Sequence, residues 1–188
     1  MKNCPQTDTQ SVYQHGQSVA DYTARLIDAL ELNDNIYNFR LPDWFSIYRK
    51  QILAHLHSYR VIFDYALFHD CGKPYCIEYD IEGKRHFPNH AEKSYETWMS
   101  IGGNETVGNL IRKDMMIDQI KAKDIDNFIK DPDAITLLIV GLAEVHSNAA
   151  MFGGVDSISF KIKWNQIDKR GRAICKKLFG GANDVDTE

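Results

Sequence analysis

Hydrophobic residues recur along most of the chain at intervals of three and four positions, which is the spacing of an amphipathic α-helix. In the first such stretch, residues 9–32, the spacing puts one apolar stripe on a single face. The stripe consists of Val12, Val19, Tyr22, Leu26 and Leu30, and His15 lies on it. Similar patterns predict one long helical region over residues 43–68 and further helices over residues 90–100, 105–116, 122–129, 134–147 and 159–179. The pattern therefore predicts an all-α fold.

One segment departs from the helical pattern. Residues 75–87 are rich in β-branched and aromatic residues around Glu82 and Gly83, which predicts a small hairpin or irregular excursion. Asn89 is expected to cap the following helix, and residues 180–188 form a polar tail that we expect to be frayed. A chain of 188 residues can bury one ordinary core. We therefore predict a single domain over residues 1–188, with its core at about residues 11–179.

Composition narrows the classes of partner. The 22 Lys and Arg residues against 26 Asp and Glu give a net charge of -4, which argues against a general duplex-DNA coat or a membrane-surface protein. The longest apolar run, residues 134–143, is shorter than the roughly 20 residues of a membrane-spanning helix. The four cysteines show no C-x-x-C spacing and are interpreted as reduced thiols. We expect a soluble, cytoplasmic protein.

Candidate chemistry gathers at the end of the second helical region. His69 and Asp70 close this apolar stretch, and a carboxylate at such a place is costly to bury without a cation or hydrogen-bond donors. His15, on the apolar stripe, is either a hydrogen-bonded core histidine or a metal ligand. Glu144 is the one ionisable residue of an apolar helix before His146, and it is either a buried ligand or the point where that helix reaches the surface.

Together these residues resemble the HD-domain superfamily of metal-dependent phosphohydrolases. The resemblance covers about residues 11–148 and is most specific in the string H-D-C-G-K at residues 69–73. It also includes an upstream His15, the string F-P-N-H at residues 87–90, and L-A-E at residues 142–144. The resemblance implies a helical bundle of the HD-domain type, with His15, His69 and Asp70 as metal ligands. The family's fourth ligand is an aspartate, and Glu144 stands at its place.

Dinuclear members of the family add two histidines. His90 matches the first of them, whereas Asp114 stands where the second is expected. The resemblance therefore implies one firmly bound ion and a conditional second ion held by His90 and Asp114. Imidazole and carboxylate ligands without a thiolate suit Mn, Fe, Co, Ni or Mg.

The implied activity is hydrolysis of nucleotides or related phosphoesters by a metal-activated water. Asp70 and Lys73 would be the catalytic residues, with Lys73 also contacting the substrate phosphate. Lys161 and Lys163, in the basic last helix, are candidate phosphate contacts or simply part of a solvated face. Three alternatives stay open: hydrolysis at RNA or oligonucleotide ends, a non-catalytic nucleotide sensor with a decayed site, and di-iron oxygenase chemistry. The sequence does not predict the oligomeric state.

Overall fold

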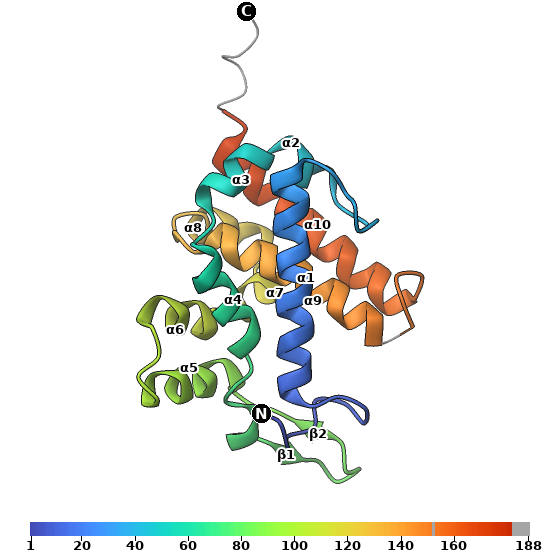
Figure 1. Cartoon of the computed structure of the whole chain (residues 1–188), viewed down its shortest axis with the longest axis vertical. Coiled ribbons are helices and arrows are strands. Elements are labelled where there is room, and N and C mark those ends of the chain that lie inside the picture. Colours follow the sequence, from blue (N-terminus) through green and yellow to red (C-terminus); the bar gives the residue numbers. More distant parts are fainter. Residues whose placement is uncertain (152, 182–188) are drawn as a thin grey trace, which may run out of the picture. The chain divides into compact units, whose positions relative to one another are not determined.

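A computed structural model describes residues 1–151 and 153–181, and these residues are mostly helical (Figure 1). The all-α prediction is confirmed at this level. The helices are α1 (Val12–Leu32), α2 (Asp43–Ile47), α3 (Arg49–His55), α4 (Tyr59–Phe68), α5 (His90–Ser100), α6 (Glu105–Arg112), α7 (Met116–Gln119), α8 (Ile125–Phe128), α9 (Ala134–Met151) and α10 (Ile158–Phe179), with 3₁₀ turns at Lys73–Tyr75 and Ala122–Asp124. None of the helices in the described ranges has both the length and the apolar character needed to cross a bilayer.

The chain divides into two compact units. The first unit contains residues 1–21 and 58–115, and the second contains residues 22–57 and the chain from Met116 onward. The helix α1 contributes residues 12–21 to the first unit and the rest to the second. The single domain expected over residues 1–188 stays a prediction. Of the tail expected to be frayed, residues 182–188 lie outside the described part of the chain.

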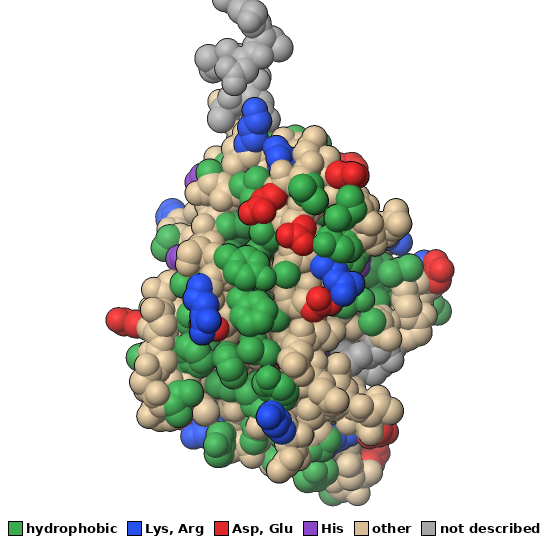
Figure 2. All heavy atoms as spheres, viewed as in Figure 1, with side chains coloured by type: hydrophobic (Ala, Val, Ile, Leu, Met, Phe, Trp, Pro, Cys, Tyr) green, Lys and Arg blue, Asp and Glu red, His purple; other side chains and the backbone are tan. Residues whose placement is uncertain are grey.

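In the first unit, α6 packs against both α4 and α5. The buried side chains Ile62, Tyr65, Leu110 and Ile111 form the core between α4 and α6, and Trp98 adds the contribution of α5. Outside this core, Tyr59 is 57% exposed and stacks on Phe63, with ring centroids 6.1 Å apart. Hydrophobic side chains are visible over the part of the surface where α4 lies (Figure 2).

The second unit is built around α9, which packs against α3, α7 and α10. Its side chains from Ala134 to Val140 are all buried, as the nearly continuous apolar pattern of this segment predicts. The approach of α2 to α10 depends on Gly171, because a Cβ atom there would lie 2.3 Å from the Trp44 ring.

The long helical region expected over residues 43–68 is wrong, because the structure divides it into α2, α3 and α4. Tyr48 leaves the helical conformation at φ -105° and ψ 23°, and Leu56 is extended. Tertiary hydrogen bonds stabilise the second break: the His57 backbone N–H donates to Thr136 Oγ1 at 3.2 Å, and His57 Nε2 lies 2.6 Å from Asp133 Oδ1. These partners are distant in the sequence, so local periodicity does not show them.

The segment after the His69–Asp70 pair contains the expected hairpin, which pairs β1 (Glu78–Tyr79) with β2 (Arg85–His86) in antiparallel register. The helix expected over residues 90–100 is confirmed as α5. Its predicted cap is wrong: Asn89 has a left-handed backbone (φ 52°), and its side chain makes no capping hydrogen bond within the described residues. The helix expected over residues 105–116 ends four residues early, at Arg112.

Candidate metal centre

A close approach of α1 to α4 brings His15 beside His69. A Cβ atom on Gly16 would lie 2.1 Å from the Leu67 carbonyl oxygen, so only glycine allows the two backbones to come this near. His15 precedes Gly16 in α1, and His69 follows Leu67 by two residues at the end of α4. The two imidazole rings consequently meet edge to face, with centroids 5.3 Å apart.

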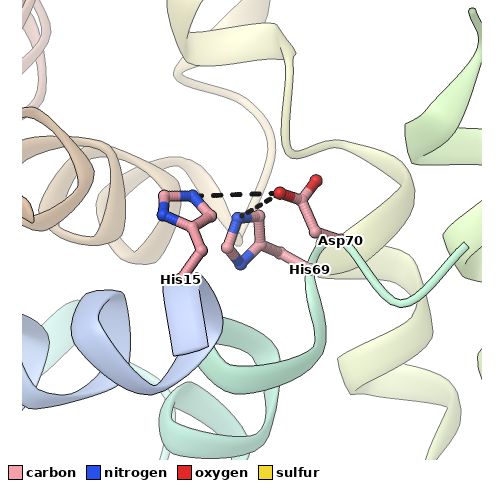
Figure 3. A group of neighbouring side chains, drawn as sticks. All are labelled: His15, His69 and Asp70. Atoms are coloured by element: carbon pink, nitrogen blue, oxygen red, sulfur yellow. Dashed lines mark ion pairs between the residues drawn. The ribbon is translucent and has the colours of Figure 1, made fainter. Parts of the chain in front are cut away.

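His15, His69 and Asp70 form a buried cluster of potential metal ligands (Figure 3). One ligand atom from each residue lies within 4.8 Å of the other two. Asp70 Oδ2 lies 3.3 Å from His69 Nε2 and 3.8 Å from His15 Nε2. All three side chains are at most 2% exposed, so they are almost completely withdrawn from water. The structure therefore brings together three of the residues predicted as metal ligands.

The orientation of His69 suits a metal ligand. Its Nδ1 lies 2.8 Å from the Ala66 carbonyl oxygen, which can only accept a hydrogen bond, so Nδ1 carries the proton. Nε2 then faces the Asp70 carboxylate, and a proton on this nitrogen attracts the carboxylate in the metal-free protein. A cation that replaced this proton would be ligated by both groups, and a backbone carbonyl is a common partner for the other nitrogen of a ligating histidine.

The Asp70 carboxylate is ionised within the protein interior. Burial opposes its ionisation, but the attraction of His69 and Lys73 outweighs burial and holds the pKa of Asp70 well below its usual range. Lys73 Nζ donates to Asp70 Oδ2 at 2.6 Å. Among the described residues, Asp70 Oδ1 accepts no hydrogen bond. A buried, charged oxygen that accepts no hydrogen bond is a favourable place for a cation.

His90 faces the same carboxylate from the start of α5. Its Nε2 lies 3.7 Å from Asp70 Oδ1, and its Nδ1 lies 3.0 Å from the Phe87 carbonyl oxygen. Burial lowers the pKa of His90, against the attraction of Asp70, so the ring is neutral at neutral pH and can act as a ligand. The structure thus places a fourth predicted ligand beside the cluster.

The turn after Asp70 is held against α5. The Gly72 backbone N–H donates to Ser94 Oγ at 2.9 Å, and a Cβ atom on Gly72 would lie 2.3 Å from the Lys93 backbone. Burial raises the pKa of the adjacent Cys71 thiol to about 11, so this cysteine stays protonated and unreactive. The turn therefore fixes the positions of Asp70 and Lys73 through packing.

Sequence reasoning missed two contacts of Lys73. Its Nζ donates to Gln6 Oε1 at 3.1 Å and lies 5.2 Å from the centroid of the Phe87 ring. Phe87 belongs to the string F-P-N-H, which could have indicated a role beside the cluster. Gln6 carries no such signal, because its position follows from the fold of the N-terminal residues.

Asp114, predicted as a conditional ligand, lies just beyond α6 in the first unit. The Tyr65 hydroxyl donates to Asp114 Oδ1 at 2.7 Å. This hydrogen bond orients the carboxylate from a fully buried side chain of α4. Participation of Asp114 in a second metal site stays a prediction.

Glu144, Lys161 and Lys163 belong to the second unit. Glu144 is half-buried on α9 and lies near Asp118, whose pKa is raised first by partial burial and next by the Glu144 carboxylate. Lys161 and Lys163 are exposed on α10, and Lys161 Nζ lies 3.9 Å from Asp156 Oδ1. Their predicted roles as a fourth metal ligand and as phosphate contacts stay predictions.

Comparisons with protein-family models, with curated proteins and with solved structures gave no match to this chain.

Proposed function

We propose that this protein is a metal-dependent phosphohydrolase of the HD-domain type that acts on nucleotides or related phosphoesters. The observation that carries the proposal is the buried convergence of His15, His69 and Asp70, in which one carboxylate oxygen accepts no hydrogen bond from the described residues. Two imidazoles and a carboxylate suit a divalent ion such as Mn, Fe, Co, Ni or Mg. His90 would add a further nitrogen at the same carboxylate.

A divalent cation held by these residues would lower the pKa of a bound water and withdraw charge from phosphoryl oxygens. The protein's own contribution begins with Asp70, which holds the negative charge that keeps a cation in place. Lys73 has three N–H donors, and within the described chain two of them go to Asp70 and Gln6. The third can donate to a non-bridging phosphoryl oxygen and stabilise charge that grows during the reaction.

His90 can transfer a proton within the same site. Its Nδ1–H is held by the Phe87 carbonyl, so Nε2 is the nitrogen that faces Asp70 and can exchange a proton with a leaving group. Because the pKa of His90 is lowered by burial, its neutral form is available at neutral pH. His90 is therefore either a ligand or a proton carrier in this proposal, and each role uses the same nitrogen.

The test combines metal binding with phosphate release. Purified protein is stripped of metal, titrated calorimetrically with Mn²⁺, and assayed for phosphate release from a panel of nucleotides with Mn²⁺, Co²⁺ or Mg²⁺. Asp70→Asn keeps the shape of the side chain but removes its charge, and we expect it to weaken metal binding by about 100-fold or more and to abolish hydrolysis. Asp64→Asn is the matched control, because Asp64 lies on α4 of the same unit and pairs with an exposed Arg60.

Two results would overturn the proposal. One is Asp70→Asn protein that binds Mn²⁺ as tightly as the wild type, which would remove Asp70 from the ligand set. The other is metal binding at the cluster without hydrolysis of any phosphoester in the panel, which would leave a metal-binding sensor instead of an enzyme.

A further inference from the structure

A cleft on the second unit has the chemistry of a ligand site and shares no residue with the metal cluster. Its volume is about 430 Å³, within the range of about 300–1,000 Å³ that small-molecule sites occupy. The cleft is lined by α1, by the loop between α1 and α2, and by α9. The residues that matter to the argument are Tyr22, Arg25, Tyr37, Phe39, Arg40 and His146.

One wall of the cleft is aromatic. The Phe39 ring lies 5.6 Å from the Tyr22 ring and 5.8 Å from the Tyr37 ring, measured between centroids. The His146 ring extends this wall, because it lies 5.0 Å from Phe39 and stacks nearly parallel to Tyr22 at an interplanar angle of 16°. Adjoining rings of this kind suit a flat heterocyclic ligand, since aromatic side chains stack on the faces of nucleobases.

The rim of the cleft is cationic. Arg25 and Arg40 both line it, and its described lining contains no acidic side chain. The Arg25 guanidinium lies 5.6 Å from the Tyr37 ring centroid, and that of Arg40 lies 4.2 Å from the Trp164 ring centroid. A guanidinium placed over a ring keeps its N–H donors in its own plane, where they can bind a phosphate or carboxylate with two parallel hydrogen bonds.

The loop that carries these residues is fixed to the unit. The Tyr37 hydroxyl donates to Asp28 Oδ2 at 2.9 Å, and the Trp164 indole N–H donates to the Arg40 carbonyl at 2.8 Å. Asn35 accepts from the Phe39 backbone N–H at 2.9 Å. The aromatic wall and the Arg40 backbone are thus held in place before any ligand arrives, which reduces the entropy cost of binding.

His146 provides an independent sign of a missing partner. Its side chain is 3% exposed and lines the cleft, and its Nε2 makes no hydrogen bond within the described residues. The ring also forms a hydrogen bond with the Arg40 backbone. Buried polar atoms in native proteins usually have a partner, so a polar group of a ligand in the cleft would satisfy Nε2.

We propose that this cleft binds a nucleoside monophosphate. The base would stack on the wall formed by Tyr22, Tyr37 and Phe39, and the phosphate would be held by Arg25 and Arg40. The proposal does not rest on the proposed function, because none of these residues belongs to the metal cluster or is among its predicted ligands. It assigns a second, metal-independent site to the chain.

Binding is tested on the full chain in EDTA, by calorimetric titration with AMP, GMP, CMP and UMP. We expect at least one nucleotide to bind, the matching nucleoside to bind about tenfold more weakly or worse, and inorganic phosphate to bind weakly, because base and phosphate both contribute. Arg40→Ala and Arg25→Ala should each weaken nucleotide binding by about tenfold. Arg172→Ala, which removes an exposed cation of α10 from the same unit, should leave it unchanged.

The ligand comparison uses wild-type protein, so it remains decisive even if an arginine variant is unstable. The absence of binding by all four nucleotides would overturn the proposal, as would equal binding of nucleoside and nucleotide. Asp70→Asn separates this site from the metal centre. Nucleotide binding in EDTA that survives Asp70→Asn supports the second site whatever the outcome of the hydrolysis assay, whereas its loss would contradict a site independent of the cluster.

Discussion

Lys73 Nζ lies 2.6 Å from Asp70 Oδ2, so the buried carboxylate of the cluster has a cationic partner three residues further along its own turn. This pair is almost inaccessible to water, because the Lys73 side chain is 10% exposed and that of Asp70 is 2% exposed. The lysine therefore stabilises the charge of Asp70 in the metal-free protein. A divalent ion would take over part of this role.

Lys73→Met tests whether a divalent ion can replace the Lys73 ammonium group as the cationic partner of Asp70. The substitution leaves Asp70 charged without its ammonium partner, and breaking a buried pair costs about 3–5 kcal/mol. We expect metal-free Lys73→Met protein to lose free energy of unfolding on this scale and to regain more of it with Mn²⁺ than the wild type gains. Urea denaturation with EDTA or with Mn²⁺ measures both quantities.

The control for this variant is Lys93→Met. Lys93 Nζ pairs with Glu96 Oε2 at 2.9 Å on the surface of α5, where solvent screening leaves an ion pair with little effect on stability. Equal stabilisation of Lys73→Met and wild-type protein by Mn²⁺ would show that the ion does not lie at Asp70.

Gly16→Ala tests the close approach that aligns the two histidines. The added Cβ atom would overlap the Leu67 carbonyl oxygen, and overpacking of this kind costs about 1–3 kcal/mol. We expect lower stability together with weaker metal binding, because separating α1 from α4 moves His15 away from His69. Gly108→Ala is the control: its new Cβ atom would lie 2.9 Å from Met99 Sδ and 3.3 Å from the Trp98 and Tyr95 rings, so it crowds side chains of α5 without touching the contact of α1 with α4, and its metal affinity should match the wild type.

The number of bound ions tests the roles of His90 and Asp114. If these residues hold a second ion, wild-type protein saturates with two Mn²⁺ ions, and the double variant His90→Ala/Asp114→Ala saturates with one. Loss of both ions in the double variant would place His90 among the ligands of the firm site. Metal analysis after equilibrium dialysis distinguishes the outcomes, and Tyr65→Phe shows whether orienting Asp114 matters to the weaker ion.

The buried Cys175 thiol should lower the free energy of unfolding at alkaline pH. Burial raises the pKa of this thiol from 9.0 to about 12, so the unfolded chain releases the proton at lower pH than the folded protein does. Below pH 9 the thiol is protonated in both states and the protein keeps its full free energy of unfolding. This free energy falls as the pH rises from 9 toward 12. At pH 10 the loss is about 1 kcal/mol relative to pH 8. Cys175→Ala should lack this part of the alkaline destabilisation in urea titrations at the two pH values, and an identical pH dependence would contradict it.

Local patterns in the sequence predicted much of the helical structure. The helical spacing of apolar residues predicts α5 correctly, and the turn residues around Gly83 predict the hairpin. The helical spacing of apolar residues over residues 43–68 did not reveal the breaks at Tyr48 and Leu56. The second break depends on His57 bonding to Thr136 and Asp133, and such partners are set by tertiary structure.

The candidate site could likewise be predicted only in part, because its residue types are local and the contacts that bring them together are tertiary. The string H-D-C-G-K and the upstream His15 predicted the residues that converge, because ligand types and their local spacing are visible in a sequence. The reasons for their convergence are contacts between distant backbones, at Gly16 with Leu67 and at Gly72 with Ser94. Gln6 lies beside Lys73 for similar reasons, so no spacing rule would have found it.

The contact of Gly72 with α5 also affects how the string H-D-C-G-K should be interpreted. Its glycine touches the backbone of Lys93 and Ser94, whereas its histidine and aspartate are the predicted metal ligands. A descendant that lost His69 and Asp70 through relaxed selection would still be constrained to keep the glycine in order to fold. In a distant sequence, therefore, a retained glycine at this position indicates the same packing of the turn, and only retained ligands would indicate the proposed metal site.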